Sequence, residues 1–281
     1  MFRLGYNTNG LAHHRVLDAL RMLADLGYEA VAITPDVGQL DPLQLDKRLV
    51  EDVRHWSEDL GLELAVETGA RFVLDAQRKH WPTMLEDASE DRARRVDMLQ
   101  RSIDLASDLG ANIVSLWSGA KPAGASDEQT WQRLCDELRR VLAHAHARDV
   151  QLAFEPEPGM FVERPAHYIE LVERLGRDGD ELGLCLDVGH LLVTKDLPAP
   201  AKIRELGNRL VHVHLDDIRD GVHEHVMFGS GTLDLPGVLS ALLDVGFDGM
   251  AAVELSRDSH RGAWAAKEAL RHLRAALGYE A

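Results

Sequence analysis

The sequence predicts an α/β fold, a (βα)8 TIM barrel that occupies residues 1–281 as a single domain. Three observations lead to this prediction. A phrase of the type Asp-Leu-Gly recurs at 25–27, 59–61, 108–110 and, as a variant, 244–246, and each copy precedes an apolar run typical of a buried strand. Eight such runs are present, spaced about 35 residues apart, the length of a strand, a loop and a helix. No Gly-x-Gly-x-x-Gly follows the first run, which argues against a Rossmann-type open sheet.

The repeated unit is a helix, a glycine stop and a strand. Val16, Leu20 and Leu23 fall on one face of the first helix, and Gly27 stands where a left-handed cap is best made without a Cβ. We expect a further helix over residues 128–147 and the longest loop over about 74–92. The expected strands are 3–6, 30–34, 62–67, 113–117, 151–155, 182–187, 210–215 and 250–255.

Composition excludes several classes of protein. Lys plus Arg number 31 and Asp plus Glu 47, and the resulting net charge of −16 opposes binding to nucleic acid or to an anionic membrane. The two cysteines, Cys135 and Cys185, fit neither a disulfide scaffold nor a zinc finger, and Cys185 is expected only to fill the barrel interior. With no targeting segment and no apolar run of about 18 residues, we expect a soluble, cytoplasmic protein.

The active site of such a barrel lies at the carboxyl ends of the strands. The last four expected strands all end in polar side chains, which are Glu155 and Glu157, Asp187 and His190, His212 and His214, and Glu254. A lone carboxylate at a strand end is most simply a capping or loop group. Carboxylates and an imidazole that share one mouth need a cation to offset their repulsion. We therefore expect one divalent metal ion, with Mn, Mg, Co and Zn all compatible with oxygen-rich ligation.

These residues carry a resemblance that spans almost the whole chain. The matching positions are Glu155 with its prolines, Asp187-x-x-His190, His214-x-x-Asp217, Gly229-x-Gly231 and Glu254. The pattern resembles the xylose isomerase-like superfamily of sugar isomerases and epimerases, whose relatives include ketose 3-epimerases, hydroxypyruvate isomerase and inosose dehydratase. The resemblance implies that Glu155, Asp187, His214 and Glu254 bind the ion, and that Glu155 and Glu254 also transfer protons. It further implies a small sugar or cyclitol as substrate, and a homo-oligomer.

The expected chemistry follows from chelation of a keto sugar through its carbonyl and adjacent hydroxyl oxygens. Such chelation acidifies the C–H group between them by stabilising an enediolate. Two glutamates on opposite sides of the sugar would then epimerise that carbon. Proton delivery to the neighbouring carbon would instead isomerise the sugar, and loss of a hydroxyl would dehydrate it. The ligand set does not decide among the three reactions.

Further side chains near the expected strand ends are candidates for substrate binding. His190 matches the substrate-contacting histidine of the family. The other candidates are Glu157, His225, Arg257, Arg71 and Trp117. Each of these five has a plainer alternative as a solvated loop residue, a surface arginine or an aromatic ring packed under a loop.

Two other functions compete with the isomerase. An endonuclease IV-like metal hydrolase would take histidines from the third and fourth strands, where this chain has Glu67 and Trp117. A noncatalytic sugar-binding barrel would not need the four metal-binding side chains. The sequence therefore favours a metal-dependent sugar isomerase or epimerase, without naming the substrate.

Overall fold

The computed structural model describes residues 1–69 and 71–279, and within them it confirms the predicted barrel. Parallel strands pair in sequence order as a closed barrel. The strands are β1 (Arg3–Asn7), β2 (Ala30–Ile33), β3 (Glu63–Glu67), β4 (Ile113–Leu116), β5 (Gln151–Phe154), β6 (Leu182–Asp187), β7 (Leu210–Leu215) and β8 (Met250–Val253). Every predicted strand coincides with an observed one, and the bounds differ by at most two residues.

Helices follow the strands as the repeat predicts. They are α1 (Val16–Leu26), α2 (Lys47–Leu60), α3 (Ser89–Leu109), α4 (Asp127–His146), α5 (Pro165–Leu175), α6 (Val188–Thr194), α7 (Ala199–Leu206), α8 (Leu235–Asp244) and α9 (Gly262–Ala276). Gly27 ends α1 with a left-handed φ of 95°, as expected, and α4 is the helix predicted over 128–147. α3 already begins at Ser89, inside the segment expected to be a loop. None of the helices in the described residues is long and apolar enough to cross a membrane.

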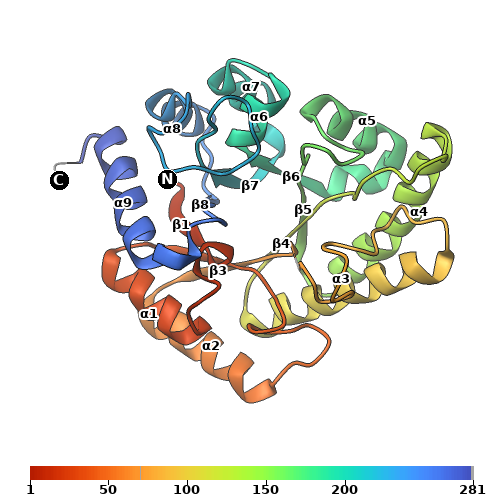
Figure 1. The fold of residues 1–281 in the computed structure, drawn as a ribbon, viewed down its shortest axis with the longest axis horizontal. Helices are drawn as coiled ribbons and strands as arrows, with labels where there is room; N and C mark the ends of the chain where they lie inside the picture. The colour runs from red at the N-terminus through yellow and green to blue at the C-terminus, as the bar shows by residue number, and fades with distance from the viewer. Residues whose placement is uncertain (70, 280–281) are drawn as a thin grey trace. The chain divides into compact units, whose positions relative to one another are not determined.

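The chain divides into two compact units. The first comprises Met1–Ile33, Trp56–Glu63 and the chain from Leu184 onward, and the second comprises Thr34–His55 and Leu64–Gly183. In the first unit β1 pairs with β2 and β8, and β7 pairs with β6 and β8, while α9 packs beside α1 (Figure 1). In the second unit β4 pairs with β3 and β5. The predicted domain bounds of 1–281 stay a prediction.

Register within the first unit places the polar side chains of β6 and β7. Cys185 is the partner of His212, and Asp187 is the partner of His214. Because side chains alternate between the two faces of a strand, these four residues share one face, while Leu184 and Leu186 point the other way. The strands are buried on both faces, so the polar side chains are withdrawn from water by the apolar residues around them.

Candidate active site

Asp187, His214 and Glu254 converge in the first unit, at the carboxyl ends of β6, β7 and β8. One ligand atom of each lies within 4.8 Å of the corresponding atoms of the others. Asp187 and His214 are fully buried, and the side chain of Glu254 is 13% exposed. The predicted convergence of these three residues is therefore found in the structure.

Hydrogen bonds hold the three side chains in place. Asp187 caps α6 by accepting a hydrogen bond from the backbone N–H of His190 at 2.8 Å. Nδ1 of His214 lies 3.0 Å from Oε2 of Glu254. Oε1 of Glu254 accepts a hydrogen bond of 2.8 Å from Nδ2 of Asn9, which lies in the 3₁₀ turn after β1. Both carboxylate oxygens of Glu254 are thus fixed, one by a residue of the turn after β1 and the other by a residue of β7.

A second cluster, formed by three histidines, adjoins the carboxylates. Nε2 of His190 lies 2.9 Å from Nε2 of His223, and the ring of His225 is 4.7 Å from that of His223. Nε2 of His190 and Nδ1 of His225 lie 3.6 Å and 3.8 Å from Oδ2 of Asp187. His190 and His225 are among the substrate-binding candidates from the sequence, and the structure brings His223 to His190 as well.

The charges of the two clusters offset one another. Burial alone would raise the pKa of Glu254, but the imidazoles of His225 and His214 lower it well below its usual range. Burial alone would lower the pKa of His225, but the carboxylates of Glu254, Asp216 and Asp187 raise it well above its usual value. These shifts favour an ionised Glu254 opposite a protonated His225.

Asp216 is a site residue that the sequence analysis missed. It is fully buried directly after β7, with Oδ2 only 2.8 Å from Nδ1 of His225. A Cβ on Gly189 would collide with this carboxylate, which accounts for a glycine two residues after Asp187. The alternation of side chains along β7 could have identified Asp216 from the sequence, because residue 216 shares a face with His212 and His214.

Asp217 organises the loop that carries His223 and His225. Its Oδ1 accepts hydrogen bonds from the backbone N–H groups of Ile218 and Leu233, and its Oδ2 accepts from those of Gly229 and Gly231, all at 2.8–2.9 Å. The His214-x-x-Asp217 and Gly229-x-Gly231 patterns are therefore two halves of one structure. The carboxylate of Asp217 binds four N–H groups of the loop backbone, and Gly231, which has no side chain, allows the backbone to come close to that carboxylate.

Glu155 and Glu157 belong to the second unit. Glu155 directly follows β5, is 3% exposed, and donates its backbone N–H to the carbonyl of Leu116 at 2.8 Å. Glu157 lies half-buried in the next loop, where its N–H donates to the carbonyl of Val162. Glu155 is therefore as buried as a ligand at a strand end is expected to be, whereas Glu157 occupies the position of a loop carboxylate.

The remaining substrate-binding candidates take three different settings. Trp117 is buried after β4, between the guanidinium of Arg95 at 4.6 Å from its ring and the ring of His80 at 5.1 Å. Arg71 lies 3.9 Å from Asp36 and is partly exposed. Arg257 is 64% exposed and pairs with Glu224 at 3.4 Å. Their roles in substrate binding stay predictions.

The donor set of the first unit fits a divalent cation. Two carboxylates and one imidazole offer the oxygen-rich ligation with a single nitrogen that Mn²⁺ accepts, and Mg²⁺, Co²⁺ and Zn²⁺ are compatible with it. All three ligand atoms are within reach of one ion, since donors bound to a common metal lie roughly 3 Å apart. The structure thus fits the predicted cofactor without identifying the metal.

Comparison with known proteins identifies the family of this chain. A family model described as the xylose isomerase-like TIM barrel matches residues 20–276. A 3-dehydroshikimate dehydratase of Pseudomonas putida is 28% identical over 207 residues, which are 69% of this chain and 31% of that protein. L-ribulose-5-phosphate 3-epimerase UlaE of Escherichia coli is 25% identical over 245 residues, 85% of this chain and 81% of that protein. The epimerase supports the predicted enzyme class, a sugar isomerase or epimerase.

Solved structures share the fold over almost the full chain. A structure of L-ribulose 3-epimerase superposes with a TM-score of 0.81 at 21% identity, covering 99% of this chain and 95% of that one. D-allulose 3-epimerase from Methylomonas sp., in complex with D-allulose, superposes with a TM-score of 0.78 at 16% identity, covering 98% and 96%. At these identities the likeness shows the barrel fold.

Proposed function

Because the chain belongs to the xylose isomerase-like TIM barrel family, we propose that it is a divalent-metal-dependent epimerase or isomerase of a small sugar or cyclitol. The observation that carries the proposal is the buried convergence of Asp187, His214 and Glu254 at three consecutive strand ends. A 3-epimerase among the relatives supports the same reaction class.

Asp187, His214 and Glu254 are the ligands we propose in the first unit, and Glu155 is the proposed fourth. Glu155 is buried and closes β5, the strand before β6 in the barrel order. When bound, the ion would polarise the carbonyl and the adjacent hydroxyl of a keto sugar, so that the C–H group between them becomes more acidic.

Proton transfer is assigned to the two glutamates. The hydrogen bond from Asn9 and the 3.0 Å contact with His214 hold the carboxylate of Glu254 in one orientation, which suits a base that must reach a single carbon. Glu155 is proposed to exchange a proton on the opposite face of the sugar. Its removal from water is typical of a group that transfers a proton without solvent leakage.

His190 and His225 are proposed to bind sugar oxygens. Both rings stand beside Asp187, and the protonated state of His225 makes it a hydrogen-bond donor. Glu157, Arg71, Trp117 and Arg257 remain proposed substrate contacts on the sequence alone.

A dehydratase is the second candidate, favoured by the 28% identical relative from Pseudomonas putida. Proton abstraction beside a carbonyl begins both reactions, so the same glutamates would serve. The two functions differ in product, because a dehydratase releases water and leaves an unsaturated product.

The test is solvent exchange in D₂O. The protein is loaded in turn with Mn²⁺, Mg²⁺, Co²⁺ or Zn²⁺ and incubated with a panel of ketoses, aldoses and inososes. The epimerase predicts one deuterium at the inverted carbon with no loss of water. Glu254→Gln should retain the fold and lose about 10²- to 10⁴-fold in rate, the usual loss when a positioned acid or base is removed.

Glu268→Gln is the matched control, because Glu268 is a surface carboxylate on α9 that pairs with Arg271. It should turn over at the native rate. Absence of exchange with every sugar and metal would refute the proposed function. Near-native turnover by Glu254→Gln would refute the assigned base.

A further inference from the structure

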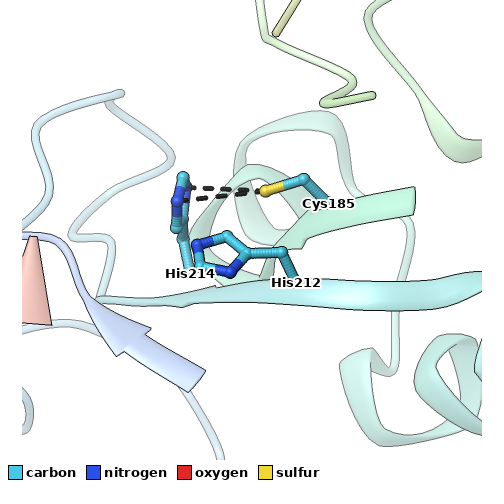
Figure 2. A group of neighbouring side chains, drawn as sticks. All are labelled: Cys185, His212 and His214. Atoms are coloured by element: carbon cyan, nitrogen blue, oxygen red, sulfur yellow. Dashed lines mark hydrogen bonds between the residues drawn. The ribbon is translucent and has the colours of Figure 1, made fainter. Parts of the chain in front are cut away.

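Cys185, His212 and His214 form a thiol-containing cluster within the first unit, which shares His214 with the candidate active site (Figure 2). Cys185 lies on β6, and both histidines lie on β7, with His212 as the register partner of Cys185. All three are buried, with exposures of 0%, 1% and 0%. Because paired strand positions set their spacing, the cluster is fixed by the backbone and not by a loop.

The donor atoms of the cluster face one another. Sγ of Cys185 lies 3.9 Å from both Nδ1 and Nε2 of His214, as the dashed lines in Figure 2 show. The rings of His212 and His214 are 5.0 Å apart and perpendicular. One ligand atom of each residue lies within 4.8 Å of those of the other two. A thiol and two imidazoles are thus gathered around one point.

His212 is the residue that a purely structural role does not explain. Both of its ring nitrogens are buried and lack a hydrogen-bond partner in the described part of the chain. A buried polar ring without partners is worse for packing than an apolar side chain of similar size. An imidazole nitrogen that has no hydrogen-bond partner is, however, available to bind a metal ion.

We propose that Cys185, His212 and His214 form a second metal site, selective for a thiophilic divalent cation such as Zn²⁺. Zinc bonds of about 2.3 Å to sulfur and about 2.0 Å to nitrogen place tetrahedral donors roughly 3.5 Å apart. The observed sulfur–nitrogen distances of 3.9 Å therefore need only a small adjustment.

The thiolate separates this site from the oxygen-rich one. Soft ligands favour Zn²⁺ and disfavour Mg²⁺ and Mn²⁺, whereas Asp187 and Glu254 offer the hard oxygens that Mg²⁺ and Mn²⁺ take. His214 belongs to both donor sets, so the two sites are adjacent but differ in the chemistry of their ions. The sequence analysis assigned Cys185 no chemistry, because the residues it contacts lie on the next strand and are distant in the sequence.

Cobalt spectroscopy tests the proposal, because a Co²⁺ ion bound to a thiolate gives a charge-transfer absorption in the near ultraviolet that oxygen and nitrogen ligands do not give. Chelator-treated full-length protein is titrated with Co²⁺. We expect the band in the wild type and in the control Cys135→Ser, whose cysteine lies buried on α4 in the other unit. We expect no band in Cys185→Ser.

A second variant tests the site even if Cys185→Ser does not fold. His212→Asn keeps the thiol and removes one ligand, so the band should persist while half-saturation needs at least about tenfold more Co²⁺. Absence of the band in the wild type at saturating Co²⁺, or its survival in folded Cys185→Ser, would overturn the proposal. An unchanged titration of His212→Asn would also overturn it.

The proposed function and the proposed thiolate site can be refuted independently of each other. Glu254→Gln removes the proposed base and retains all three members of the cluster, so it should keep the cobalt band. A protein that shows the band but exchanges no sugar proton would refute the epimerase alone. A protein that exchanges protons but shows no band would refute this site alone.

Discussion

Replacement of Asp217 by Asn should destabilise the protein strongly, although the two side chains have almost the same shape. The carboxylate accepts four backbone hydrogen bonds, two on each oxygen. An amide keeps one acceptor oxygen and turns its NH₂ group toward two N–H donors. Two bonds to a charged acceptor are therefore lost, each with about 1.5–3 kcal/mol of stabilisation.

The expected loss in the free energy of unfolding is about 3–6 kcal/mol, and the lower end is favoured because water can reach the part-buried amides of Gly229 and Gly231. This loss lowers the Tm by about 6–12 °C for a chain of this size. Urea denaturation measures the free energy. Hydrogen exchange should show that protection is lost first at the amides of 218, 229, 231 and 233.

Asp220→Asn is the matched control, because Asp220 is exposed in the same loop and its φ of 58° suits asparagine. Its stability should change by less than about 0.5 kcal/mol. If Asp217→Asn proves as stable as this control, the carboxylate does not organise the loop and the reasoning from its four hydrogen bonds is wrong.

Three further predictions concern the loop, the pH dependence and the ion. Gly231→Ala should lose about 1–3 kcal/mol of stability, because its Cβ would collide with the loop backbone, whereas Gly38→Ala, which has open space, should lose little in urea melts. Burial and nearby cations lower the pKa of His80 to about 3. The unfolded chain therefore binds a proton, below about pH 6.5, that the folded state does not accept, and stability should fall as pH decreases toward 3. His80→Asn should lessen that fall between about pH 7.5 and about pH 5, and equal slopes for both proteins would contradict it. Chelation should lower the Tm of the protein loaded with Mn²⁺, an ion that the thiolate site disfavours. About 2.7 kcal/mol should be regained at a Mn²⁺ concentration near 100 times Kd, and Asp187→Asn should show no such shift.

Local sequence pattern was sufficient to predict the barrel and the convergence of three candidate ligands. Asp187, His214 and Glu254 each stand at the end of a short apolar run, and parallel strands bring their carboxyl ends to the same edge. The polar residue at the end of each strand and the glycine before the next are properties of a few neighbouring residues.

Contacts between distant residues were decided only by the tertiary structure. Asn9 reaches Glu254 across 245 residues of sequence, and Cys185 meets His214 because β6 and β7 are parallel neighbours in a particular register. Asp217 accepts hydrogen bonds from amides up to 16 residues away only because the loop folds back on its carboxylate. No local pattern encodes these pairings, since they depend on strand register and loop conformation, which are set by the packing of the whole unit.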